Sequence, residues 1–434
     1  MSGTANGNHR AAGARRWAGI AASLLAACGI VWGCSGPAAA ADLATSAATR
    51  GDASGADAAQ AAAATTAFGL DLLRIEDFAA GNVVLSPASI AFALAMARAG
   101  AGGETASQMD TVMHSAAESG SGNGLNSLDQ ALAGLSGTVT VGGQDQQLTL
   151  RIANAPFAQR GYPLESAYLD ALATKFGAGL RLVDFSGDPS GAIGSINGWV
   201  SDQTEKRIPN LLDQLDANTR LVLVNAIYLK APWQTQFEPG ATSDQPFTHL
   251  DGSRVDVPTM SSEMECSYAQ GSGWQAADLP YAGGSLVMTI IVPDDMAGFE
   301  GGLTAEQFGR ITAAMQPARL DLALPRFKTE TKSDLAATLA SMGMPLAFDP
   351  LNADFSGITR KERLFIAAVV HQATISVDEK GTEATAATAV VMAVASPPPS
   401  AASLHVDRPF LFAIRDTRTG AILFLGRIVD PAAS

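Results

Sequence analysis

Cysteine and charged side chains are both scarce in this sequence. Only Cys28, Cys34 and Cys266 occur in 434 residues, and the first two lie in the N-terminal segment. No structural disulfide is therefore expected in the body of the protein, which must rely on its core for stability. Charged residues make up 16% of the chain, and the formal net charge is −14. This acidity argues against nucleic acid or an anionic membrane surface as a partner, since both reward clustered Lys and Arg.

The common catalytic signatures are also missing. The chain has no G-x-S-x-G elbow, H-E-x-x-H helix, paired C-x-x-C, P-loop or dinucleotide-binding glycine pattern. A hydrolase that pairs His371 with a serine would lack any recognisable nucleophile motif. We therefore expect no cofactor, no metal site and no enzymatic activity.

What the chain does contain is apolar material for a large core. Hydrophobic residues make up 47% of the sequence, which describes a folded globular protein rather than a disordered one. The one dense basic run, residues 360–363, is short and is expected to be a solvated loop.

The first segment, residues 1–41, has the features of an export signal. Three arginines precede an apolar run over residues 17–32, and alanines follow it. Two processing routes stay open: lipidation of Cys28, as in a bacterial lipoprotein, or cleavage after Ala41 and free secretion. Residues 42–64 are rich in small residues and are expected to be a flexible tether before a folded domain at 65–434. The protein would then be a cell-envelope lipoprotein or extracellular, touching a membrane only through a lipid anchor.

The body mixes helical and strand patterns without regular alternation, which favours an α+β fold. Helices are expected from residue 65, from a cap at Ser86 and Pro87 to Met96, and at 163–176, 191–206 and 333–342. Strands are expected at 83–85, 148–157, 221–229, 286–292, 320–327 and 364–377, with a loop at 115–126 and a terminal hairpin of 409–414 and 421–425. The strand at 221–229 is almost continuously apolar, so it should lie in the middle of a sheet covered on both faces, and its Asn225 requires partners.

An unusual segment follows the strand that ends near Val377. Residues 382, 384, 386, 388 and 390 alternate as Thr, Ala, Ala, Thr and Val, all uncharged and either small or β-branched, and proline begins only at 397. Such a stretch could enter a sheet as a central strand, which proline or charge would obstruct. Composition alone would favour a small-residue linker between two strands.

Four segments of the sequence resemble the serpin family in order and spacing. They are NVVLSPASI at 82–90, LVNAIYLKAPW at 223–233, DEKGTEA at 378–384 and PFLF at 409–412. The resemblance spans about 65 to 432. It implies a serpin fold with three β-sheets, eight or nine helices and an exposed reactive-centre loop from about Gly381 to Val406.

The resemblance also implies a function. In that family a target serine protease attacks the loop as a substrate, forms an acyl-enzyme, and is trapped when the loop inserts into the large sheet. The expected partner is therefore a serine protease held in a covalent complex, and the inhibitor itself is expected to be a monomer. A non-inhibitory serpin-fold binding or structural protein is the alternative, although its hinge would typically carry proline, charge or bulk.

By the same resemblance, several residues receive roles. The insertion hinge is Gly381, Thr382, Glu383, Ala384, Thr385, Ala386, Ala387 and Thr388. A polar cluster under the opening sheet is Ser86, Ser89, Asn225 and His371, which would equally serve as an ordinary buried polar network. The top of the loop is Trp233, Arg326 and Glu379.

Family spacing counted from the hinge places the reactive bond between Ala395 and Ser396. Counting back from Pro409 lands within the prolines instead, so Val394 and Met392 remain alternative reactive residues. A small residue before the bond suits an elastase-like or subtilisin-like protease, and Met392 would suit a chymotrypsin-like one.

Overall fold

The computed structural model describes residues 41–75, 81–115, 122–215, 218–383 and 402–433. The predicted export signal at residues 1–41 therefore lies outside the described residues, apart from Ala41. Nine α-helices lie within these ranges. They are α1 (Gly55–Leu73), α2 (Pro87–Arg98), α3 (Gly103–Val112), α4 (Gly122–Ala133), α5 (Ser166–Phe176), α6 (Pro189–Gln203), α7 (Met296–Gly302), α8 (Ala305–Ala314) and α9 (Ala336–Met342).

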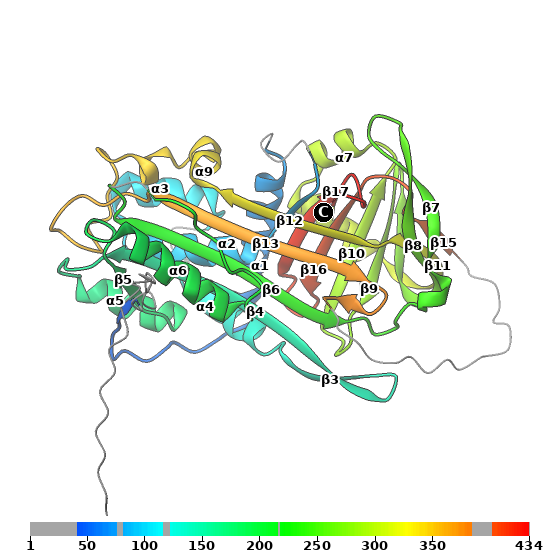
Figure 1. Ribbon diagram of the computed structural model, residues 1–434, viewed down its shortest axis with the longest axis horizontal. Coiled ribbons are helices and arrows are strands. Elements are labelled where there is room, and N and C mark those ends of the chain that lie inside the picture. The colour runs from blue at the N-terminus through cyan, green and yellow to red at the C-terminus, as the bar shows by residue number, and fades with distance from the viewer. Residues whose placement is uncertain (1–40, 76–80, 116–121, 216–217, 384–401, 434) are drawn as a thin grey trace, which may run out of the picture. The chain divides into compact units, whose positions relative to one another are not determined.

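A large mixed sheet runs through the molecule beside these helices (Figure 1). Its eight strands have the order β1-β5-β4-β6-β14-β13-β12, with β3 paired to β4 outside this path. They are β1 (Asp42–Ala44), β3 (Gly137–Val141), β4 (Gln144–Gln159), β5 (Leu180–Val183), β6 (Leu221–Pro232), β12 (Phe327–Asp334), β13 (Ala368–Asp378) and β14 (Gly381–Thr382).

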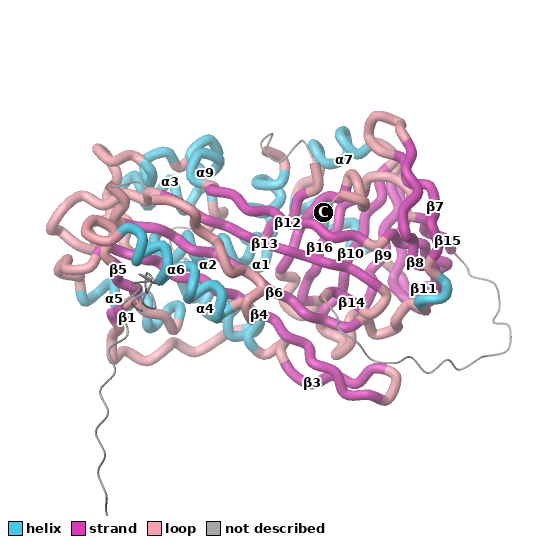
Figure 2. The backbone as a smooth tube through the Cα atoms, viewed as in Figure 1, coloured by secondary structure: helices cyan, strands magenta, loops and turns pink. Residues whose placement is uncertain are grey.

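A second network of nine strands has the order β15-β11-β8-β9-β10-β16-β17-β2, with β7 paired to β8 (Figure 2). They are β2 (Val83–Leu85), β7 (Ser243–Thr248), β8 (Arg254–Gly271), β9 (Trp274–Pro280), β10 (Leu286–Pro293), β11 (Gln316–Pro325), β15 (Ala402–His405), β16 (Phe410–Asp416) and β17 (Ile422–Ile428). The long strand β8 pairs with β7 and β11 over 254–268 and with β9 over 267–271. It thus connects the two parts of this network, and the predicted α+β fold with several β-sheets is confirmed.

The two faces of the large sheet pack against different cores. Leu223, Ile227 and Leu229 of β6 join the main hydrophobic core, which includes most of α2. The alternate residues Val222 and Val224 belong to a smaller cluster with α6. Because both faces are covered, β6 is a continuous apolar run, as expected for a central strand.

The N-terminal segment corrects one prediction: residues 42–64 are not a flexible tether. Asp42–Ala44 forms β1, which pairs antiparallel with β5, and α1 begins at Gly55. Between them Arg50 donates hydrogen bonds to Asn126 (2.8 Å) and Asp129 (2.5 Å). Ser54 caps α1 by accepting from the Asp57 N–H. The alanines that resemble a linker in composition are strong helix formers once a cap is present.

Other boundaries differ by short stretches. The loop predicted at 115–126 ends earlier, because α4 begins at Gly122. The helix predicted from Ser333 begins at Ala336, since Ser333 and Asp334 continue β12 by pairing with β13. The strand predicted from 364 begins at Ala368, although Leu364 and Ile366 before it are buried in the core. The cap at Ser86 and the terminal hairpin are confirmed.

Candidate functional site

The first two residues of the predicted hinge form a strand within the large sheet. Gly381 and Thr382 form β14, which pairs antiparallel with β13 on one side and with the end of β6 on the other. Gly381 has φ +148°, and a Cβ there would lie 2.2 Å from the Ala231 carbonyl oxygen. The position therefore requires glycine for both its backbone conformation and its close approach to β6.

Thr382 is held by aromatic residues at the same place. Its side chain is 1% exposed, and its hydroxyl shares a 2.6 Å hydrogen bond with the Tyr281 hydroxyl. The Tyr281 ring stacks on Trp233 with 4.4 Å between ring centroids. Trp233 in turn donates from Nε1 to the Asp378 carbonyl (2.9 Å) and from its backbone N–H to the Lys380 carbonyl (2.9 Å). The hinge thus enters the sheet against a rigid aromatic pair that sequence reasoning identified only in part.

Arg326 and Glu379, two of the residues assigned to the top of the loop, form an ion pair. Arg326 donates from Nε to Oε1 of Glu379 at 2.8 Å, and Thr242 donates to the same oxygen. Burial alone would raise the pKa of Glu379, but the hydrogen bonds from Arg326 and Thr242 outweigh it and lower the pKa. The Phe237 N–H also donates to the Glu379 carbonyl, so the turn before the hinge is fixed at both backbone and side chain.

The four residues of the predicted polar cluster also come together. The backbone N–H of Ser86 donates to Nε2 of His371 (3.3 Å), so Nδ1 carries the hydrogen and donates to Oδ1 of Asn225. Asn225 donates from Nδ2 to Ser89 and to Asn154, and Ser89 donates to Asn154 at 2.9 Å. Asn154 was not predicted, because no motif marks it within the long strand β4.

His371 is neutral in this cluster. It is fully buried, and burial lowers its pKa to about 3. Both ring nitrogens are already engaged, and no substrate could reach them. This arrangement argues against His371 as the general base of a hydrolase.

The cluster lies across a seam between two strands. β6 and β13 pair in parallel over 222–227 and 368–373, and Asn225 is the register partner of His371. Toward their other ends the two strands separate, and β14 lies between them. A strand that continued β14 would have to part Asn225 from His371.

The remaining loop residues lie outside the described residues. These are Ala384, Thr385, Ala386, Ala387, Thr388, Met392, Val394, Ala395 and Ser396. The chain resumes at Ala402 in β15, which pairs in parallel with β11. Cys28 also lies outside the described residues.

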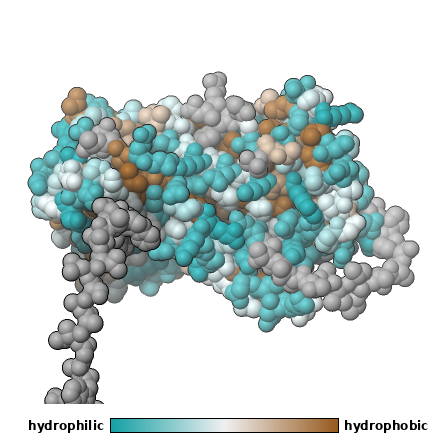
Figure 3. Space-filling model, viewed as in Figure 1, coloured by the Kyte–Doolittle hydropathy of each residue, from teal (hydrophilic) through white to brown (hydrophobic). Residues whose placement is uncertain are grey.

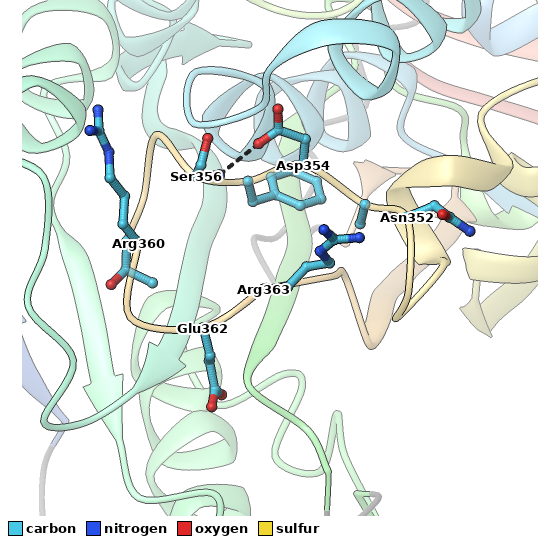
Figure 4. Close-up of a pocket in the computed structure, with 9 residues that line it drawn as sticks. Asn352, Asp354, Ser356, Arg360, Glu362 and Arg363 are labelled. Carbon is cyan, nitrogen blue, oxygen red and sulfur yellow. Dashed lines mark hydrogen bonds between the residues drawn. The ribbon is translucent and has the colours of Figure 1, made fainter.

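A surface pocket lies elsewhere, in the loop before β13. It encloses about 380 Å³ and is lined by residues 352–356, 359, 360, 362 and 363 (Figure 4). Arg363 points toward Asp354, which accepts from the Ser356 N–H, while Arg360 and Glu362 project away from it. Residues 360–363 are exposed, as predicted for a solvated loop. The molecular face shown in Figure 3 is largely hydrophilic, with scattered hydrophobic residues.

Other chemistry is limited in the part of the chain that the structure describes. No helix there is long and apolar enough to span a membrane. Among the same residues, no group of three or more His, Cys, Asp or Glu is placed to hold a metal ion. Cys266 is a free thiol, and burial raises its pKa to about 11, so it is a poor nucleophile. The arrangement is that of a protein whose central sheet accepts a strand from its own chain.

Comparisons with known proteins agree with this description. The family model described as serpin (serine protease inhibitor) matches residues 63–431. A serpin-like protein of Thermococcus kodakarensis is 39% identical over 355 residues, which cover 81% of each chain. Leukocyte elastase inhibitor of Bos taurus is 36% identical over 390 residues, covering 86% of this chain and all of the relative.

A solved structure shows the same fold. Tengpin, a thermophilic serpin crystallised in its native state, superimposes with a TM-score of 0.78 at 27% identity and covers 89% of this chain and 99% of its own. The chain belongs to the serpin family. Inhibitory relatives within that family support protease inhibition as its general function.

Proposed function

We propose that the protein is an irreversible suicide-substrate inhibitor of serine endopeptidases with elastase-like or subtilisin-like specificity. The reactive bond would join Ala395 and Ser396, with Val394 and Met392 as the alternatives. The observation that carries the proposal is β14: Gly381 and Thr382, the start of the predicted hinge, lie between β6 and β13, and residues 384–391 of the sequence are uncharged.

Loop insertion has a favourable energetic balance. About a dozen further residues would each gain a backbone hydrogen bond worth roughly 0.5–1.5 kcal/mol net, on the order of 10 kcal/mol in total. The cost includes parting β6 from β13 and breaking the hydrogen bond between Asn225 and His371. The backbone partners lost between these strands are replaced by those of the inserted strand.

The trap follows from ordinary acyl-transfer chemistry. The protease serine oxygen attacks the Ala395 carbonyl, the bond to the Ser396 nitrogen breaks, and that nitrogen leaves as the new amine. The loop is then joined to the protease as an ester, and insertion pulls on this ester. Loss of a single oxyanion donor slows acyl transfer by about 10²–10³-fold, so a deformed site would leave the ester unhydrolysed.

The cellular setting belongs to the same proposal. The apolar run at 17–32 supports export, either as a lipoprotein anchored through Cys28 or as a secreted monomer. Mass spectrometry of the protein released from an expressing cell would decide between a lipidated N-terminus at Cys28 and a free one at Asp42.

Inhibition is tested by incubating the chain from Asp42 onward with an elastase-type protease, followed by denaturing gels and mass spectrometry. A stable adduct near the summed mass, with cleavage after Ala395, is expected. Cleavage after Val394 or Met392 within the adduct would keep the mechanism and move the register. Cleavage without adduct by elastase-, subtilisin- and chymotrypsin-like proteases would favour the non-inhibitory alternative.

Thr382→Arg provides the matched control. The Thr382 site is 1% exposed, so an arginine cannot be buried there without a large penalty. The variant should still be cut at the same bond but should release active protease. An adduct from this variant would contradict insertion through β14.

A further inference from the structure

Glu383 ends the inserted strand in an unusual conformation. Its φ is +49°, in the left-handed region that non-glycine residues rarely adopt, and its backbone N–H donates to the Ser376 carbonyl at 3.0 Å. Its side chain is only 11% exposed. A charged residue that turns out of a strand could point into water, but this one is folded against the protein.

The Glu383 carboxylate lies among cationic and aromatic groups from three elements. Arg207, which follows α6, places Nε 3.6 Å from Oε2, and its guanidinium lies 5.9 Å from the centre of the Tyr228 ring. Tyr228 of β6 lies close enough to lower the pKa of the carboxylate, and Lys230 of β6 and Lys328 of β12 add positive charge. Glu205 adds a negative charge near Tyr228. Among the described residues, Oε2 has no hydrogen-bond partner.

The turn that carries Arg207 has a strained backbone and is held by several hydrogen bonds. Glu205 and Lys206 have φ values of +51° and +64°, two consecutive non-glycine residues in the left-handed region. The Arg207 N–H donates to the Thr204 carbonyl at 2.9 Å, and the Thr204 hydroxyl links Val200 to Ile208. Such strained conformations persist only where surrounding contacts impose them. Its effect is to fix Arg207 above Tyr228.

The strand register shows what Glu383 blocks. Thr382 is paired with Ala231, so a continued strand would pair residue 383 with Lys230 and residue 385 with Tyr228. Tyr228 and Lys230 share the α6 face of β6 with Val222 and Val224. The turn at Glu383 therefore ends the strand where the next pairs would form.

We propose that Glu383, Arg207 and Tyr228 form a latch that holds the hinge at two inserted residues in the uncut protein. The latch couples the end of α6 to the hinge. Its role in regulating inhibition rests on the proposed inhibitory function. The contacts themselves can be tested independently, because docking of the hinge can be measured without any protease.

The latch should respond to pH in a defined direction. Burial raises the pKa of Glu383, and Arg207, Tyr228, Lys328 and Lys230 only partly offset it. The docked hinge therefore binds a proton more readily than an undocked hinge, whose carboxyl has an ordinary pKa. Docking is strongest below that ordinary pKa and weakens as pH rises through the raised pKa.

Hydrogen exchange of the peptide spanning 376–383, corrected for intrinsic pH dependence, measures docking directly. In the natural sequence, exchange should rise with pH across this window. Glu383→Gln should remain docked and lose the pH dependence. Arg207→Gln should exchange about three- to fivefold faster at neutral pH, the effect of a half-exposed ion pair, and Arg207→Lys should restore most of the protection.

Arg360→Gln is the matched control, because it removes an exposed arginine from a distant loop. It should exchange like the natural sequence. The latch is overturned if Glu383→Gln keeps the original pH profile, or if Arg207→Gln matches the Arg360 control. Tryptophan fluorescence of each variant checks that the fold is intact.

Adduct formation by the same variants separates the two proposals. If the variants change hydrogen exchange as predicted but neither they nor the natural sequence form an adduct, the inhibitory function is refuted and the latch is retained. If all of them form adducts but none changes hydrogen exchange, only the latch is refuted.

Discussion

Gly381 is the residue on which insertion depends most directly. Its φ of +148°, and the 2.2 Å that would separate a Cβ at this position from the Ala231 oxygen, leave no room for a side chain. Gly381→Ala should displace β14 and lower the free energy of unfolding by about 1–3 kcal/mol, measured by urea denaturation. Gly309→Ala, in α8 with open space around its Cβ, should be neutral or slightly stabilising. Equal effects at the two positions would contradict the role of Gly381.

His371 gives the protein a pH-dependent stability. Its pKa is about 3 in the folded protein and ordinary, near 6.5, in the unfolded chain. The unfolded chain therefore binds the extra proton, so the contribution of His371 is fully present above pH 6.5 and is lost as pH falls toward 3. Between pH 6.5 and 5 the free energy of unfolding should fall by about 2 kcal/mol because of His371.

Urea unfolding at pH 7.5 and pH 5 tests this expectation. His371→Gln should start less stable at pH 7.5, because it loses hydrogen bonds to Ser86 and Asn225, but should lose less on acidification. An acid-induced loss as large as that of the natural sequence would assign the pH dependence to other groups.

For individual residues of the site, the sequence predicted those that match the family pattern and missed those that do not. Ser86, Ser89 and Asn225 were found because short family-like segments contain them, and the resemblance to the family assigned His371 as well. Asn154, Tyr281 and Arg207 reach the site only through tertiary packing, from segments whose local pattern is that of an ordinary strand or loop. Nothing in their spacing could have indicated the contact.

Among the elements, β6 and β13 determine how a strand can enter the sheet. On one face their residues pack in the small cluster under α6, and on the other Asn225 and His371 join them through the polar cluster. Besides the backbone pairing between the two strands, their separation must therefore disturb a small apolar layer and break the hydrogen bond between Asn225 and His371. Both are modest costs beside the backbone bonds that a new strand would form.

The N-terminal segment is an element in its own right. A chain beginning at Ser54 would lack β1 and the contacts of Arg50 with Asn126 and Asp129. We expect its free energy of unfolding to be about 1–3 kcal/mol lower than that of a chain beginning at Asp42, measured by urea denaturation. Equal free energies of unfolding for the two chains would mean that residues 42–53 contribute no stability, as expected for a tether.

The elements of the core were the most predictable part of the fold. The helix after Ser86, the strand from Leu221 and the terminal hairpin carry strong apolar patterns and were placed correctly. The segment at 42–54 was misjudged because it is held by edge pairing and side-chain contacts rather than by an apolar face. Composition cannot reveal such contacts.

For the whole molecule, cleavage of the reactive loop should increase stability. If the loop extends β14 through the sheet, on the order of 10 kcal/mol should be gained, which corresponds to a rise in Tm of about 10–15 °C for a domain of this size. Calorimetry before and after cleavage measures the change. Cleaved Thr382→Arg should show no comparable gain, and an unchanged Tm in the natural sequence would mean that the cut loop stays outside the sheet.

The position of β1 also determines at which end of the large sheet the protein would be attached through its N-terminal segment. β1 pairs with β5, which adjoins β4 beside Leu221, whereas β14 adjoins the other end of β6 at Ala231. About ten residues of strand, roughly 33 Å, separate the two places. An attachment through the chain upstream of Asp42 would therefore join the protein near β1, at the end of the sheet away from β14. Under the proposed mechanism, insertion of the loop would move a bound protease along the sheet, from the end at β14 toward the end at which the protein is attached.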